Sequence, residues 1–120
     1  MIIERMQGMH GICAVVRDDG VPISDGASAL DVLMEAQYEA GTKNLAIAKK
    51  QIAEDFFILS TGVAGEILQK LVNYGGRIAI YGDFSRYTSK PLKDFMRESN
   101  RGRDVFFVAS EEEAIAALTR

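Results

Sequence analysis

Largely apolar runs of four or five residues recur along the chain, and turn-forming residues lie between them. Continuous apolar runs of this length are typical of strands that are covered on both faces of a sheet. Four such strands are predicted, at residues 12–16, 44–48, 78–81 and 105–108. Residues 2–7 alternate only loosely between apolar and polar side chains, which predicts a short strand at an edge of the sheet.

The stretches between these runs carry apolar residues three or four positions apart, which is the period of an amphipathic helix. Helices are predicted over about 27–40, between Ser60-Thr61-Gly62 and Gly75-Gly76, over about 90–101, and after Ser110. Side chains that extend the predicted apolar faces include Tyr38 and Val72. The helix starts offer N-caps of the preferred types, namely Ser24, Asp25, Ser28, Ser89 and Ser110.

Residues 51–59 fit neither period, because the run Phe56-Phe57-Ile58-Leu59 suits a strand and a packed loop equally well. The remaining elements follow one another in the order ββαβαβαβα. Strands that alternate with helices indicate a mainly parallel sheet, and the first two strands are close enough to form an antiparallel hairpin. We therefore predict a single α/β domain over residues 1–120, a length that suits one hydrophobic core.

The charge balance is slightly acidic, with 14 Lys and Arg against 17 Asp and Glu and a net charge of −3. Binding that is dominated by phosphates needs a basic surface, so this balance argues against nucleic acid as a partner. A single cysteine, Cys13, and a single histidine, His10, exclude an intrachain disulfide and a zinc site of the Cys₄ or Cys₂His₂ type. We predict no metal, no cofactor and no catalytic residue.

No segment approaches the roughly 18 apolar residues of a membrane-spanning helix. Glu4 and Arg5 interrupt the apolar residues at the start of the chain, where a secretion signal would need an unbroken apolar region. We expect a cytoplasmic protein without membrane contact, which agrees with a lone thiol.

The Ser60-Thr61-Gly62 step that opens a helix, and the Gly75-Gly76 pair that leads from it into the next strand, resemble the STAS domain of anti-sigma-factor antagonists. That resemblance implies a STAS-like fold and a phospho-acceptor at Thr61, the second hydroxyl residue before the glycine, with Ser60 beside it. Leu59 departs from the pattern, because STAS domains usually carry an acidic residue there. The alternative is that either hydroxyl is simply the N-cap of the helix.

Longer strings resemble an uncharacterised bacterial family, the domain of unknown function 4180. They are residues 53–57, 61–70, 82–90 and 97–103, the third of which reads Gly-Asp-Phe-Ser-Arg-Tyr-Thr-Ser-Lys. The chain is identified as a member of this family on these strings. The family implies no established activity.

A polar constellation follows the predicted strand 78–81, at the strand end where open α/β sheets bind ligands. Arg86 there suits an anion, Asp83 a cation, and the hydroxyls at the following helix start suit a phosphate. Glu54 and Asp55 follow the preceding strand and are expected at the same edge. The alternative is a surface loop with a helix cap and an Arg86–Asp83 contact. The candidate binding surface comprises Glu54, Asp55, Asp83, Ser85, Arg86, Thr88, Ser89 and Lys90.

Residues 77–103 hold seven basic and three acidic side chains, in contrast to the acidic chain as a whole. Such a stretch suits an acidic partner, or it is a solvated helix face with Lys90–Asp94 and Glu98–Arg101 pairs.

The sequence therefore predicts a non-enzymatic regulatory module that binds a protein partner through residues 54–66 and 83–90. The first alternative is a protein or enzyme that binds a small anion or phosphorylated metabolite with the 83–90 loop. The second is a symmetric homodimer that uses the edge strand 2–7 or an apolar helix face.

Overall fold

The five strands lie in the sheet in the order in which they occur along the chain. The computed structural model describes residues 1–120. It confirms the predicted order of strands and helices, with three 3₁₀ turns added between β3 and α2. The strands are β1 (Ile2–Gln7), β2 (Ile12–Arg17), β3 (Asn44–Ala48), β4 (Arg77–Tyr81) and β5 (Val105–Val108), and the helices are α1 (Gly26–Ala40), α2 (Val63–Asn73), α3 (Lys90–Asn100) and α4 (Glu111–Thr119).

The pairing of the strands confirms a mainly parallel sheet with an N-terminal antiparallel hairpin. Strand β1 pairs antiparallel with β2, and β2, β3, β4 and β5 are parallel to one another. Each parallel connection contains a helix, because a chain must cross back over the sheet before it can add a parallel strand. The carboxyl ends of four strands consequently lie at one edge of the sheet.

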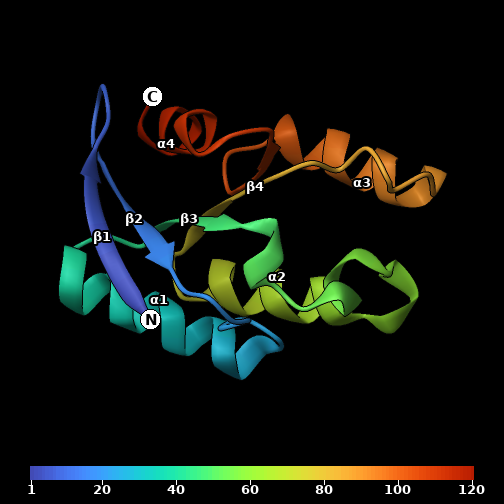
Figure 1. Ribbon diagram of the computed structural model, residues 1–120, viewed down its shortest axis with the longest axis horizontal. Coiled ribbons are helices and arrows are strands. Elements are labelled where there is room, and N and C mark those ends of the chain that lie inside the picture. The colour runs from blue at the N-terminus through green and yellow to red at the C-terminus, as the bar shows by residue number, and fades with distance from the viewer.

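Helices cover both faces of the sheet, with α1 and α2 side by side on one face and α4 on the other (Figure 1). The strand residues divide between the two faces in strict alternation. In β2, for example, Ala14 and Val16 belong to the larger core under α1 and α2, and Cys13 and Val15 belong to the smaller core under α4. Burial on both faces explains why the strands read as continuous apolar runs.

Local sequence signals set most helix boundaries. The carboxylate of Asp25 accepts the N–H of Ser28 at 2.8 Å as the N-cap of α1, and Ser110 accepts the N–H of Glu113 at the start of α4. Gly41 ends α1 in the left-handed region at φ 71°. The predicted apolar faces are too wide, because Tyr38 is 87% exposed and Val72 is 43% exposed.

The segment between β3 and α2 matches the apolar pattern of neither a strand nor a helix. It contains three 3₁₀ turns, at Lys49–Gln51, Glu54–Phe57 and Leu59–Thr61. The turns follow the carboxyl end of the sheet and bury Phe56 and Phe57 in the larger core. Helix α2 accordingly begins at Val63, and Ser60 and Thr61 lie in the last 3₁₀ turn rather than in the helix.

The outer edge of β5 is partly closed by a side chain. Asn100, the last residue of α3, accepts the N–H of Phe107 at 2.7 Å and donates to its carbonyl oxygen at 3.0 Å. The amide thus takes the place of a neighbouring strand at this position, which protects the edge from pairing with another chain. None of the helices has the length and apolar character that crossing a membrane would require.

The thiol of Cys13 is expected to be unreactive in the folded protein. Its side chain is fully buried, and burial, followed by the negative charge of Glu111, raises its pKa to about 11. At pH 8 only roughly one thiol in a thousand would then be ionised. We expect iodoacetamide to label Cys13 readily in 6 M guanidinium chloride and at a rate lower by about two orders of magnitude or more in buffer, as followed by intact mass. Comparable rates in the two conditions would contradict this packing.

Candidate functional site

Two segments that are far apart in the sequence meet beyond the carboxyl edge of the sheet. Residues 49–61 follow β3 and residues 82–89 follow β4, which are neighbouring parallel strands. Both connections lie at the same end of the molecule, between the sheet and the starts of α2 and α3 (Figure 1). Glu54 therefore reaches the edge that its position after a buried strand predicts.

Charged groups connect the two segments directly. The carboxylate of Glu54 accepts a hydrogen bond from the Arg86 guanidinium at 2.5 Å and another from the Tyr87 hydroxyl at 2.6 Å. The Tyr87 hydrogen bond, followed by the contact with Arg86, keeps the pKa of Glu54 below its usual value. At neutral pH the Glu54 carboxylate is therefore ionised and occupied by both partners, which ties the 3₁₀ turn at Glu54–Phe57 to the loop before α3.

Aromatic rings lie beneath this polar contact. The rings of Phe57 and Tyr87 are stacked with centroids 5.1 Å apart, and Phe84 packs against Phe57 at 6.0 Å. The ammonium group of Lys49 lies 5.1 Å from the centroid of Tyr87, within the range of a cation–π interaction. The two segments consequently form one packed unit, which we call the loop platform (residues 49–61 and 82–89).

A glycine permits the close approach of the two segments. Gly82 has a φ of 156°, and a Cβ atom built there would lie 2.9 Å from the Cβ of Lys49. An alanine at this position would have to adopt an unfavourable backbone conformation and displace the Lys49 side chain. Gly82 thus allows the chain that leaves β4 to pass close to Lys49, directly after β3.

The other predicted residues of the 83–90 loop are occupied mainly by local contacts. Asp83 accepts the N–H of Ser85 at 2.9 Å, and hydrogen bonds from Ser85 lower the pKa of the Asp83 carboxyl. Ser89 is the N-cap of α3, and Lys90 pairs with Asp94 at 2.7 Å. The expected Arg86–Asp83 contact is wrong, because Arg86 pairs with Glu54 across the platform.

Asp55 and Thr88 are exposed members of the same surface. Asp55 takes part through its backbone, since its carbonyl oxygen lies 2.8 Å from the Thr61 hydroxyl. No hydrogen bond of the Thr88 side chain is present. The structure therefore brings Glu54, Arg86 and Tyr87 into one contact, and leaves the side chains of Asp55 and Thr88 outside it.

The two hydroxyl residues before α2 are exposed but differ in their surroundings. The Thr61 hydroxyl lies 2.8 Å from the carbonyl oxygens of both Asp55 and Ile58, and it accepts the N–H of Val63 at 3.2 Å. Ser60 makes no hydrogen bond through its side chain. The Thr61 oxygen is therefore part of the turn that positions α2, whereas the Ser60 oxygen is free in solvent.

The first turn of α2 presents unpaired amide groups. The N–H groups of Ala64 and Gly65 have no acceptor within the chain, as is usual at a helix start. Glu66, in the same turn, accepts the N–H of Gly26 at 2.5 Å and so links the starts of α1 and α2. The helix start can therefore attract an anion through its amides, but Glu66 adds a negative charge nearby.

The surroundings of the hydroxyls contain no imidazole. The single histidine, His10, lies in the β1–β2 turn, where its backbone N–H donates to the carbonyl oxygen of Thr119. That turn precedes β2 and lies at the amino edge of the sheet, opposite the loop platform. Neither Ser60 nor Thr61 can therefore be activated by an adjacent imidazole in the manner of a serine hydrolase.

Three residues that organise the site are not identified as site residues by sequence reasoning, namely Lys49, Phe57 and Tyr87. Lys49 reads as a residue that ends a strand, and Phe57 and Tyr87 read as ordinary core and loop residues. The available signal is the placement of Phe57 and Tyr87 in the segments that directly follow two neighbouring strands, β3 and β4. It becomes informative only when the strand order is known.

The fold and the loop platform define a small α/β protein with a mainly parallel sheet and two interlocked loops at its carboxyl edge. The family model described as domain of unknown function DUF4180 matches residues 10–118, so the chain belongs to this family. This result confirms the membership that the sequence strings indicate. The search of curated proteins and the search of solved structures returned no match. The description of the family assigns no activity.

Proposed function

We propose that this protein is a non-enzymatic, STAS-like regulatory module of the cytoplasm, which binds a protein partner through residues 54–66 and 83–90. The observation that carries the proposal is the locking of two loops by Glu54, Arg86 and Tyr87 beside two exposed hydroxyls. A surface whose loops are already ordered loses little conformational freedom when a partner binds, which favours affinity.

The same surface offers an apolar contact point. Ile58 is 48% exposed although its neighbours Phe56 and Phe57 are buried. Exposed apolar side chains within a polar rim are the usual centres of protein interfaces. Ile58 lies between the platform contacts and the hydroxyl residues, so a partner that covers it also meets Ser60 and Thr61.

We further propose that phosphorylation at Thr61, or at Ser60, regulates this binding. A phosphoryl group on Thr61 would remove the hydroxyl hydrogen that faces the carbonyl oxygens of Asp55 and Ile58, and it would add a charge of about −1.5 to −2. Both effects disturb the turn at Leu59–Thr61. A phosphoryl group on Ser60 would add the charge without breaking a hydrogen bond, so it alters electrostatics rather than the shape of the turn.

The substitution Thr61→Glu tests the switch. We expect it to reduce the amount of partner captured from host lysate by about fivefold, equivalent to about 1 kcal/mol, because it replaces a donor by a charge that faces two carbonyl oxygens. The variant should keep a cooperative thermal transition, since the residue is exposed. Capture followed by mass spectrometry measures the effect, and the intact mass of protein purified from its host reports any phosphate.

A matched control is Ser99→Glu, which adds the same charge in α3, away from the platform. We expect it to leave capture unchanged. If Thr61→Glu and Thr61→Ala both capture the partner as the unsubstituted protein does, the regulatory role of Thr61 is excluded.

The alternative, an anion or phosphometabolite site in the 83–90 loop, has less support. The Arg86 guanidinium is already paired with Glu54, and the Asp83 carboxylate is bound by Ser85. Homodimerisation through the exposed edge of β1 would make a second copy the partner. Light scattering at high concentration separates that case from binding to a different protein, because only a homodimer doubles the mass of the purified chain.

A further inference from the structure

Three arginines and one phenylalanine lie together at the amino edge of the sheet, opposite the loop platform. Arg77 begins β4, Arg103 lies just before β5, and Arg120 follows α4. Together with Gly102, Asp104 and Phe106 they line a cavity of about 500 Å³, which we call the arginine cavity. This volume lies within the range of small-molecule sites.

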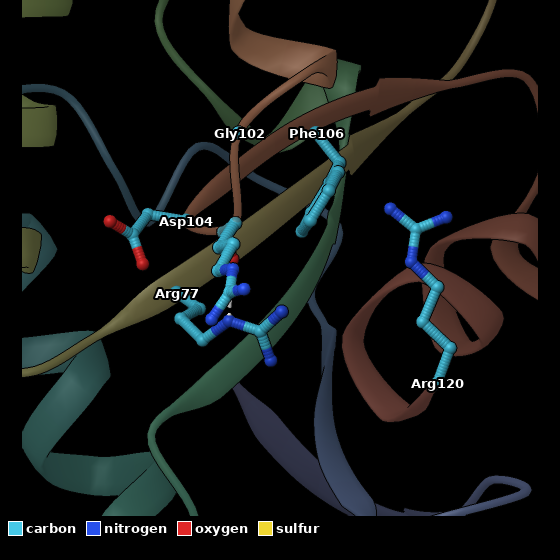
Figure 2. A pocket seen from close by; sticks show the side chains of 6 residues that line it. Arg77, Gly102, Asp104, Phe106 and Arg120 are labelled. Carbon is cyan, nitrogen blue, oxygen red and sulfur yellow. Dashed lines mark hydrogen bonds between the residues drawn. The ribbon is translucent and has the colours of Figure 1, made fainter.

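The guanidinium groups of the arginine cavity have no carboxylate partner. Four of the five other arginines pair with acids, namely Arg17, Arg86, Arg97 and Arg101. By contrast, no carboxylate lies within 4.0 Å of a guanidinium nitrogen of Arg77, Arg103 or Arg120. The Asp104 carboxylate points away from Arg77 and Arg120 (Figure 2). Three positive charges therefore share one cavity, and its single lining carboxylate, Asp104, forms no ion pair with them.

Two of the three guanidinium groups are positioned by the fold. Arg77 donates to the carbonyl oxygens of Arg103 at 2.6 Å and Leu118 at 3.1 Å, and it lies 5.7 Å from the centroid of Phe106. Arg120 extends from the end of α4 toward the same ring, with its guanidinium carbon 5.3 Å from the ring centroid (Figure 2). Because hydrogen bonds hold Arg77 in place, this side chain can bind an anion with little loss of side-chain entropy.

An apolar groove continues from the arginine cavity. It has a volume of about 600 Å³, lies between β5 and α4, and shares Phe106 and Arg120 with the cavity. Most of its lining is apolar, and its outer wall includes the exposed Ala116 of α4. A ligand that extends from the cavity into the groove would place a charged end on the arginines and an apolar end on the groove wall.

We propose that the arginine cavity binds the phosphate or carboxylate group of a small organic anion, whose apolar part lies in the adjoining groove. Like charges in close proximity repel one another, and a bound anion removes that repulsion while it accepts charge-assisted hydrogen bonds. This site lies at the opposite edge of the sheet from the loop platform, so the proposal does not rest on the proposed partner binding or on phosphorylation.

Titration of the ¹⁵N-labelled full-length chain with three probes tests the proposal. Inorganic phosphate tests the anion site alone, phenyl phosphate adds an apolar ring, and benzoate replaces phosphate by carboxylate. We expect saturable NMR shifts of the three arginine Nε–H signals and the amides of residues 102–106, and tighter binding of phenyl phosphate than of inorganic phosphate by about tenfold. Saturation by phenyl phosphate alone assigns a phosphate ligand, and saturation by benzoate alone assigns a carboxylate ligand.

Variants distinguish the site from general attraction of anions. Arg103 and Arg120 make no hydrogen bond through their side chains, so the variants Arg103→Gln and Arg120→Gln should fold normally. Each substitution should lower the affinity for phenyl phosphate by about tenfold. Arg5→Gln is the matched control, because Arg5 is an exposed, unpaired arginine on β1 at the far edge of the sheet. Arg77→Gln is less suitable, because Arg77 also supports two backbone carbonyls.

Ala116→Leu tests the groove separately. The larger side chain fills the groove without changing an arginine, so it should abolish the advantage of phenyl phosphate and leave the affinity for inorganic phosphate unchanged. Absence of saturable shifts up to about 10 mM of every probe, or equal weakening by Arg5→Gln and Arg103→Gln, would overturn the anion site. Unchanged binding of phenyl phosphate by Ala116→Leu would overturn the role of the groove.

Discussion

Replacement of Gln51 by alanine should lower the free energy of unfolding by about 3 kcal/mol. Gln51 is 4% exposed, and its side chain connects the ends of two strands. Its Oε1 atom accepts the N–H of Ala48 at 3.0 Å, and its Nε2 atom donates to the carbonyl oxygens of Val16 and Asp18 at 3.2 and 3.0 Å. Alanine removes a hydrogen bond from each of these three backbone groups at a position that is almost fully buried. Urea unfolding measures the loss.

The substitution Gln51→Glu gives this prediction a pH signature. It replaces the amide donor with an oxygen that faces two carbonyl oxygens, so the fold favours the neutral acid and raises the pKa of the introduced carboxyl. The loss of folding stability caused by Gln51→Glu is then small below about pH 4.3, the pKa of a glutamate in the unfolded chain, and it grows as the pH rises above that value. The variant should therefore be less destabilised at pH 4 than at pH 7, relative to the unsubstituted protein at each pH.

Gln69 supplies the matched control for both variants. It is exposed on α2 and donates only to Asn73. Gln69→Ala and Gln69→Glu should change stability by less than about 0.5 kcal/mol and without a similar pH dependence. A loss of that small size for Gln51→Ala would show that water replaces the side chain without cost.

Truncation of Phe56 to alanine is the second large effect, with an expected loss of about 3–5 kcal/mol. The ring is fully buried and packs against Phe57 at 4.9 Å and Phe107 at 6.2 Å between ring centroids. It anchors the 3₁₀ turn that carries Glu54, so its loss should also release the Glu54–Tyr87 contact. Denaturant unfolding measures the first effect, and NMR shifts of the 83–89 amides report the second.

Ile58→Ala, two residues along the same segment, is the control. Ile58 is about half exposed, so we expect a loss below about 1 kcal/mol and unchanged shifts in residues 83–89. If Phe56→Ala alters stability no more than Ile58→Ala does, the segment is not anchored by the buried ring.

Most of the fold can be predicted from the sequence because its signals are local. Each buried strand is a short apolar run between turn residues, and Asp25, Ser89 and Ser110 mark helix starts by hydrogen bonds that span only three residues. The exposed positions of Tyr38 and Val72 could not be predicted, because the width of a helix face depends on which neighbours pack against it.

The candidate site could be predicted only in part. Its location beyond two strand ends follows from the parallel sheet, and Glu54 and Arg86 are both expected there. Their pairing is not expected, because 32 residues separate them. Asp83 is much nearer to Arg86 in the sequence and is therefore the expected partner of Arg86. The 3₁₀ turns at 49–61 also escape prediction, since their stability comes from Gln51 and Phe56 contacts with distant parts of the chain.

The sequence by itself determined the order of strands and helices, the mainly parallel sheet and the family, because alternation, caps and characteristic strings act over a few residues. Only the tertiary structure decided the loop platform and the arginine cavity. Arg77, Arg103 and Arg120 are spread over 44 positions, and the sequence places only the first two in one basic stretch, residues 77–103, without indicating a common site with Arg120. They become one site because the amino ends of β4 and β5 and the end of α4 meet at the same edge of the sheet.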